Sequence, residues 1–267
     1  MKIKHIFYKL TEIYRKLSVP QFTIVTGLII IFFGTLILSS PLCSSSDVGL
    51  WEAFFTSTSA ITVTGLTIIN VGDDLNIFGQ IFLAFMLLSG GLGLMAITTF
   101  LQGFVVKGTQ LRTRLDKGKT LDEFGVGGIG RTFQSIAITA TSIISFGAII
   151  LYCFGFLEIK NNWERLWSAI FHSISAYNNA GFSLWSNSLQ DYRSNFVVNI
   201  VFIFLIVMGG LGWRVIDDIW SNRKNLSYKK LNLHSRLVIR TSLSLIFFGS
   251  LGFFIIETCL LYTSPSP

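Results

Sequence analysis

The stretch WEAFFTSTSAITVTGL, residues 51–66, recurs in altered form as WSAIFHSISAYNNAGF, residues 167–182. In each copy a short hydroxyl-rich segment runs into a single glycine, Gly65 in the first and Gly181 in the second. Trp, Ala, Phe, Ser, Ser, Ala and Gly fall in register between the copies. A pattern of this length that occurs twice in one chain indicates duplicated architecture.

The composition is that of an integral membrane protein. Hydrophobic residues make up 51% of the chain and charged residues 13%, and the mean hydropathy is +0.61, too apolar for a soluble domain of this length. Five stretches approach the ~20 apolar residues that cross a ~30 Å hydrocarbon core. They are 22–39, 77–104, 132–157, 196–216 and 237–257. We therefore expect an all-α protein that crosses the lipid bilayer repeatedly.

The placement of positive charge predicts the orientation, because Lys and Arg are retained on the cytoplasmic side. Cations are frequent before the first span and in every second connection, whereas residues 40–76 have none and 158–195 have only Lys160, Arg165 and Arg193. The N-terminus is thus expected in the cytoplasm. The net charge of +7 reports topology rather than a nucleic-acid surface, so nucleic acid is not an expected partner.

Two segments, 50–61 and 166–177, are too short to span the bilayer. Each lies between spans of opposite direction, so it must enter from outside and return to the same side as a re-entrant hairpin. Irregular backbone at membrane depth is tolerated only where it lines a wet cavity or is buried in protein. The returns, 62–66 and 178–182, should be such backbone.

The returns have the features of a cation filter. A short helix directs about half a negative charge at whatever lies beyond its C-terminus. Glycine permits backbone angles that turn carbonyls inward, and a ring of carbonyls can replace the hydration shell of K⁺ without any carboxylate. The candidate ion-binding residues act through their backbone: Thr62, Val63, Thr64, Gly65, Asn178, Asn179, Ala180 and Gly181. Asp73, Asp74 and Asp191 lie farther toward the outer mouth, either attracting cations weakly or serving as ordinary loop charges.

At this point the chain resembles the Trk/Ktr/HKT superfamily of potassium transporters, whose subunit is similar to four potassium-channel subunits fused in tandem. The segments LSVPQ (17–21), TVTGL (62–66) and NNAGF (178–182) look like those of the Ktr-type membrane subunit. The resemblance implies K⁺ uptake across the cell inner (cytoplasmic) membrane, with Gly65 and Gly181 as filter glycines. Members that prefer sodium often have serine at the first position, so Gly65 favours potassium. A sodium or non-selective monovalent cation transporter of the same superfamily, or a non-conducting membrane scaffold, is the alternative.

The resemblance also implies a homodimer of the full-length subunit and a separate cytosolic nucleotide-binding regulatory subunit. Members carry four repeats, so we expect this chain to be a fragment with two repeats and one further span. In chain order we expect a cytoplasmic N-terminus (1–21), a first pore repeat (22–104), a cytoplasmic linker (105–131), a second pore repeat (132–216), a second cytoplasmic linker (217–236), the first span of a third repeat (237–257) and a non-native tail (258–267).

Catalysis finds no support. The sequence has no paired carboxylate in a span, no Ser/His/Asp grouping and no metal-ligand spacing. GVGGIG at 125–130 matches G-x-G-x-x-G, but no strand precedes it, so we interpret it as a flexible cytoplasmic hinge. The chain is not expected to be an enzyme or to bind a cofactor, and K⁺, or Na⁺ under the alternative, is the ion that it should hold.

Three further expectations follow from the repeat. His172 is interpreted as a hydrogen-bonded structural residue rather than a ligand or proton carrier. Gly-Gly-Leu-Gly occurs at 90–93 and 209–212, either for close helix packing, which we favour, or as hinges. Both repeats begin inside and run in the same sense, which disfavours an inverted-repeat carrier and predicts that Gly65 and Gly181 lie side by side at one depth.

Overall fold

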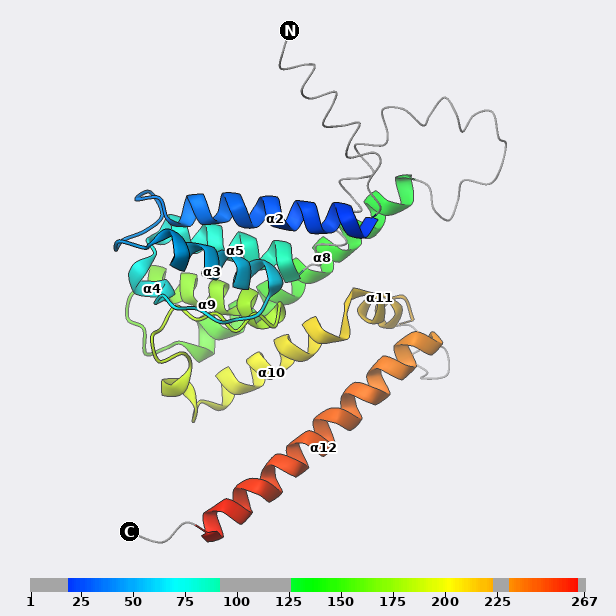
Figure 1. The fold of residues 1–267 in the computed structure, drawn as a ribbon. Coiled ribbons are helices and arrows are strands. Elements are labelled where there is room, and N and C mark those ends of the chain that lie inside the picture. The colour runs from blue at the N-terminus through cyan, green and yellow to red at the C-terminus, as the bar shows by residue number, and fades with distance from the viewer. Residues whose placement is uncertain (1–18, 92–125, 223–230, 264–267) are drawn as a thin grey trace, which may run out of the picture. The chain divides into compact units, whose positions relative to one another are not determined.

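The computed structural model describes residues 19–91, 126–222 and 231–263, and every element in these ranges is a helix (Figure 1). The one extended pairing there is an isolated bridge between Ser44 and Leu75. The expectation of an all-α protein is confirmed for this part of the chain. The chain divides into two compact units, Met1–Gly210 and Leu211–Pro267.

The first unit contains both copies of the repeated sequence in the same order of elements. The first copy comprises α2 (Val19–Leu38), α3 (Leu50–Thr62), α4 (Val71–Asp74) and α5 (Ile77–Gly91). The second comprises α8 (Val126–Ile150), a π-helical turn (Leu151–Gly155), α9 (Asn162–Tyr177), a 3-10 turn (Gln190–Tyr192) and α10 (Phe196–Leu211). The short helix α3 contacts α2 and α5, and α9 contacts α8 and α5. The contact between α5 and α9 joins the two copies.

Local capping decides where the two short helices begin. The Glu52 carboxylate accepts a hydrogen bond of 3.0 Å from the Gly49 N–H, which holds the first turn of α3. Asn161 accepts a bond of 3.0 Å from the Trp163 N–H, and α9 therefore begins at Asn162 instead of at 166 as predicted. Side-chain caps of this kind satisfy N–H groups that the helix itself leaves unpaired.

One asparagine in each copy caps the second apolar helix and ties it to the first. Asn76 Oδ1 accepts from the N–H groups of Phe78 and Gly79, and its Nδ2 donates to the Leu42 carbonyl at 2.7 Å. Asn195 does the same in the second copy, with its Nδ2 3.2 Å from the carbonyl oxygen of Gly155. The duplication thus extends beyond the matching sequence to the N-terminal ends of α5 and α10.

Two predicted spans have different bounds in the structure. The span expected at 132–157 begins with α8 at Val126, so the GVGGIG segment, interpreted from the sequence as a flexible hinge, is helical from Val126 on. No proline interrupts this segment and an apolar helix follows it, so the helix continues through its glycines. The span expected at 196–216 ends at Leu211, because Gly212 has a φ of 80° that a helix cannot continue through.

Two helices in the described ranges are long and apolar enough to cross a membrane, Gln134–Gly155 and Leu233–Thr258. They would be three if α10 and the helix that follows it were one span. Thr23–Leu38 and Ile77–Gly91 are shorter apolar helices. Residues 92–104 of the predicted second span lie outside the described residues.

The second unit consists of α11 (Trp213–Ser221) and α12 (Leu233–Thr263), and α12 extends beyond both ends of the predicted span 237–257. Asp218 holds the turn before α12, since its carboxylate accepts from the Asn232 N–H at 2.9 Å and from the Asn222 amide at 3.1 Å. The hydroxyl of Ser235, the Asn232 N–H and the Asn222 amide lower the pKa of the Asp218 carboxyl below its ordinary value. The carboxylate is therefore a structural anchor of this turn.

A hydrogen bond between the two copies joins α9 to α5. The Trp167 indole N–H donates to Gln80 Oε1 at 2.7 Å, and Gln80 Nε2 donates to the Leu75 carbonyl at 2.9 Å. Gln80 is buried, so both ends of its amide are satisfied inside the protein.

We expect Trp167→Phe to lower the free energy of unfolding by about 1–3 kcal/mol, because it leaves the buried Gln80 oxygen without a donor. Thermal unfolding in detergent measures this. Trp163→Phe is the matched control, since Trp163 lies on the same helix and is 67% exposed. Equal unfolding midpoints for the two variants would show that the bond does not join the copies.

Candidate functional site

The two return segments follow the same backbone path. Val63 and Asn179 occupy equivalent positions and both have a φ of 55°. Two residues later, Gly65 and Gly181 have φ values of 81° and 74°. Non-glycine residues seldom adopt the left-handed conformation, so its occurrence at matching positions marks a backbone that the fold enforces twice.

Hydrogen bonds back to the preceding helix fix each return. The Thr64 N–H donates to the Ser59 carbonyl at 2.9 Å, and the Ala180 N–H donates to the Ser175 carbonyl at 2.8 Å. The same serines also bind the returning chain through their hydroxyls. Ser59 Oγ accepts from the Leu66 N–H at 3.0 Å, and Ser175 Oγ donates to the Phe182 carbonyl at 2.7 Å. Each return is therefore held at two points by one helix residue.

Gly65 and Gly181 lie side by side, as the sequence predicted. A Cβ at Gly65 would stand 2.2 Å from the Ala180 carbonyl oxygen and 3.3 Å from Gly181 Cα. A Cβ at Gly181 would meet Gly65 Cα at 3.6 Å, an ordinary contact. The first glycine is thus required for space as well as for its backbone angle, and the second for its angle alone.

The predicted residues at the end of each short helix differ in exposure. Thr62 is the last residue of α3 rather than part of the irregular return, and its hydroxyl lies 2.7 Å from that of Thr64. Both threonines are exposed. Asn178 and Ala180 are buried instead, and Asn178 Nδ2 donates to the Ile174 carbonyl at 2.8 Å.

Three of the described Gly-Gly-Leu-Gly glycines, Gly90, Gly91 and Gly209, serve close packing, as favoured from the sequence, whereas Gly210 and Gly212 do not. A Cβ at Gly90 would stand 2.4 Å from the Ile61 carbonyl oxygen, and one at Gly209 would stand 1.7 Å from that of Tyr177. Gly91 lies against the Asn178 side chain. The second apolar helix of each copy thus touches the end of the short helix. Gly212, with open space around it and a positive φ, fits the hinge interpretation, and Gly93 lies outside the described residues.

His172 is a structural residue, as predicted. Its Nδ1 lies 2.8 Å from the Ser168 carbonyl oxygen and its Nε2 lies 3.4 Å from the Leu184 N–H nitrogen. A carbonyl can only accept and an N–H can only donate, so these partners assign the neutral tautomer protonated at Nδ1. The ring stacks on Trp185 at 4.1 Å, in an aromatic cluster with Phe156 and Tyr192. Burial of Tyr192, and then the negative charges of Glu158 and Asp191, raise the pKa of Tyr192 above its ordinary value.

A cavity of about 260 Å³ borders the second return. Ser175, Asn179 and Gly181 line one side of it, and Phe202 and Ile206 of α10 line another. Two residues of this return, Asn179 and Gly181, thus border hollow space, while Asn178 and Ala180 are packed inside the protein.

The three acidic residues that the sequence analysis placed toward the outer mouth lie in polar segments of the fold, and two of them have local partners. Asp74 accepts from the Asn70 N–H at 2.8 Å and from the Ser46 hydroxyl at 2.9 Å. Asp191 accepts from the Asn187 amide at 2.6 Å, and Asp73 is exposed. Two of the three thus have a structural use in their loops. Over the described ranges, no three His, Cys, Asp or Glu side chains gather into a set that could hold a metal ion.

Sequence reasoning missed the residues that support the returns. Ser59 and Ser175 were among the matched positions, so their register was the available signal, but the sequence does not tell that their hydroxyls reach the returning chain. Asn76 and Asn195 had no such signal, because the second copy is longer between its glycine and its asparagine.

Comparison with known proteins gives a consistent set of relatives. The family TrkH, described as cation transport protein, matches residues 21–263. "Ktr system potassium uptake protein B" of Bacillus subtilis (strain 168) is 32% identical over 247 residues, covering 92% of this chain and 54% of that protein. The protein of the same name from Vibrio alginolyticus is 29% identical, covering 89% of this chain and 52% of that protein. "Potassium/sodium uptake protein NtpJ" of Enterococcus hirae is 32% identical, covering 91% and 53%. The chain spans about half the length of these relatives.

We expect Ser175→Ala to destabilise the fold by about 1–2 kcal/mol, because the buried Phe182 carbonyl loses its donor. Ser173→Ala is the matched control on the same helix, since the Ser173 hydroxyl is buried and has no hydrogen-bond partner within the described ranges. Its removal should be neutral or mildly stabilising. Chemical denaturation in detergent measures both, and equal losses would contradict the role assigned to Ser175.

Proposed function

We propose that this chain, which belongs to the TrkH family of cation transport proteins, carries two segments of a filter through which K⁺ enters the cell across the cytoplasmic membrane. The observation that supports this best is the meeting of two identical return paths at Gly65 and Gly181. The family is one of transport proteins and not of enzymes, as expected from the sequence. Its apolar helices are those of a membrane protein.

The proposed filter works through its backbone. In a regular strand successive carbonyls point in opposite directions. Left-handed residues at alternate positions allow successive carbonyls to face one side, where they can replace the hydration shell of K⁺. We assign this role to Thr62, Val63, Thr64 and Gly65 in the first copy and to Asn178, Asn179, Ala180 and Gly181 in the second. The C-terminal ends of α3 and α9, which we propose as pore helices, add the negative ends of two helix dipoles.

In this proposal, selectivity for K⁺ over Na⁺ depends on the close contact between Gly65 and the backbone of the second return. Its Cα lies against the backbone of the second return, so a side chain there would displace Ala180 and the carbonyls next to it. Transport of Na⁺ beside K⁺ is the second candidate, because the Enterococcus hirae relative is named a potassium/sodium uptake protein.

The exposed side chains of the first copy support a filter ring built from more than two return segments. Trp167 binds Gln80 of the preceding copy, whereas Trp51, in the equivalent position, is 76% exposed. Thr62 and Thr64 are exposed as well. We propose that two further repeats cover this face and close the ring, which agrees with relatives of about twice the length.

The remaining parts of the proposal follow the same family. The Bacillus subtilis and Vibrio alginolyticus relatives are named as proteins of Ktr systems, which supports a separate cytosolic regulatory subunit. We further propose a homodimer of the full-length subunit and a cytoplasmic N-terminus, the latter from the alternation of cation-rich and cation-poor connections.

The decisive experiment is rubidium uptake by the full-length gene product in a host that cannot grow at low potassium. Saturable uptake that K⁺ inhibits supports the proposal, and equal inhibition by Na⁺ supports the second candidate. Normal protein levels in the membrane without uptake of either ion would overturn both.

We expect Gly65→Ser to reduce the K⁺ to Na⁺ preference by about tenfold, equivalent to 1.4 kcal/mol. Gly181→Ser should have a smaller effect, because the added Cβ meets only ordinary contacts while the left-handed angle costs about 1–2 kcal/mol. Gly249→Ser on α12, where nothing lies within 4 Å of an added Cβ, is the control. Inhibition of rubidium uptake by Na⁺ measures how much preference each of the three variants loses. An unchanged preference in Gly65→Ser would count against Gly65 as a filter residue.

We expect residues 1–257 expressed alone to give no potassium-selective uptake, because two returns cannot close a ring and unsatisfied polar backbone in lipid costs several kcal/mol per group. Co-expression with a chain that supplies two further repeats should restore uptake. Selective uptake by residues 1–257 alone would show that two copies suffice.

A further inference from the structure

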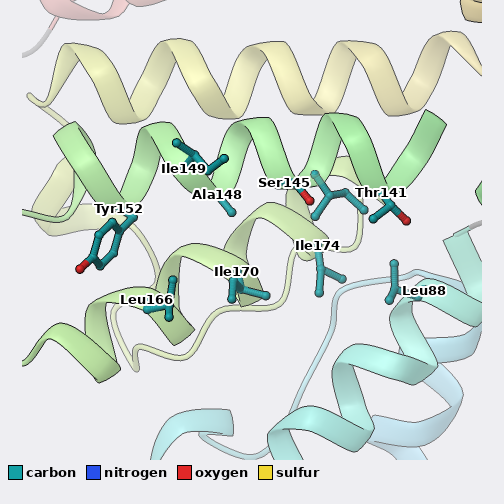
Figure 2. Close-up of a pocket in the computed structure, with 10 residues that line it drawn as sticks. Leu88, Thr141, Ser145, Ala148, Ile149, Tyr152, Leu166, Ile170 and Ile174 are labelled. Atoms are coloured by element: carbon teal, nitrogen blue, oxygen red, sulfur yellow. The ribbon is translucent and has the colours of Figure 1, made fainter. Parts of the chain in front are cut away.

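A second cavity, of about 420 Å³, lies mainly within the second copy, and none of the residues of the returns lines it. Its walls come from α8 and α9, with Leu88 of α5 at one end (Figure 2). Ile144, Ile149 and Ile170 are among its lining residues, so most of the wall is hydrocarbon. The volume is within the range of ordinary ligand sites.

At the end of the cavity opposite Leu88, Tyr152 belongs to the lining, and Arg165 lies next to Tyr152. Figure 2 shows Tyr152 at this end, with its hydroxyl directed away from the other labelled residues. The Arg165 guanidinium carbon lies 4.6 Å from the centre of the Tyr152 ring. Arg165 Nη2 donates to Asn162 Oδ1 at 2.9 Å, and its Nε is buried without a hydrogen-bond partner among the described residues. A planar guanidinium has five N–H donors, and a group of this kind is suited to a phosphate.

The side of the cavity faces a surface of the kind that lipid covers. Ile149 is 61% exposed beside it, and Ser145 and Thr141 of α8 are exposed as well. Two amphipathic aromatic side chains lie near the end of the cavity opposite Leu88: Tyr152 and Trp163, the latter one turn before Leu166. Such rings gather at a membrane interface. A mostly apolar cavity with an arginine next to the tyrosine at one end matches a molecule with a hydrocarbon tail and an anionic head.

We propose that this cavity binds one acyl chain of an anionic phospholipid, with the lipid phosphate at Arg165 and Tyr152. The charge on Arg165 selects the anionic head, and the isoleucine-lined slot between α8 and α9 holds the tail. Because Ile170 and Ile174 belong to α9, the bound lipid also supports the helix that leads to Asn178. The inference needs the membrane but not the filter, so it stands or fails independently of the proposed ion.

The test is native mass spectrometry of the full-length protein in detergent, titrated with palmitoyl-oleoyl phosphatidylglycerol or with the matching phosphatidylcholine. We expect one phosphatidylglycerol to bind at least about fivefold more tightly than phosphatidylcholine, and Arg165→Gln to remove this preference. Arg193→Gln, an exposed arginine of the same outer segment, should leave it unchanged. Loss of the preference in both variants, or in neither, would overturn the proposal.

A second pair of variants tests the tail. Ser145→Phe fills the slot from an exposed position and should weaken binding of both lipids by about tenfold, since the acyl chain loses its place. Ser142→Phe, also exposed on α8 but not lining the cavity, is the control for folding and surface area. Unchanged lipid binding in Ser145→Phe would show that another segment of the protein, or nothing, occupies the slot.

Discussion

The described structure depends on one constraint, which is that two stretches of irregular backbone in an apolar protein must be held in place by hydrogen bonds to the rest of the fold. A polar group left unpaired in an apolar setting costs several kcal/mol. The chain meets the constraint by folding each return onto the helix that precedes it, with Ser59 and Ser175 as the anchors. Other features serve to place these two helices.

The placement is achieved by residues at the helix ends. Asn76 and Asn195 start the second apolar helices and bind the chain that closes the first ones, so each short helix lies within a frame fixed at its outer end. At the other end, Gly90 and Gly209 allow the second apolar helix to touch the last carbonyls of the short helix. The contact at Gly90 and Gly209 leaves no room for a side chain, so small changes there would move the returns themselves.

The sequence predicted the helices, the duplicated order and the adjacency of Gly65 and Gly181, because these follow from apolar length, charge alternation and register. It placed Thr62 in the irregular return, although that residue completes α3. It also extended the span from 196 past Leu211, since apolar length alone does not reveal that Gly212 takes a left-handed angle. Hydropathy cannot find such a break because it does not register backbone conformation. The supports of the site were equally hidden, because a hydrogen bond such as that of Trp167 to Gln80 joins residues far apart in the chain.

The two copies support the same backbone path with different side chains. In the second copy His172, Trp185 and Tyr192 form an aromatic cluster behind the return, whereas Thr56 stands in the place of His172 in the first copy. In the first copy the Asp74–Ser46 bond joins the end of α4 to the loop that precedes α3, and Asp191 binds Asn187 within its own segment. The side chains of the returns differ too, with Thr62 and Thr64 against Asn178 and Ala180. What the copies share is the pair of left-handed residues and the backbone bonds beside them. A site that recognised its ligand through side chains would need matching side chains, so the shared backbone favours recognition by carbonyl oxygens, which suits a dehydrated monovalent cation.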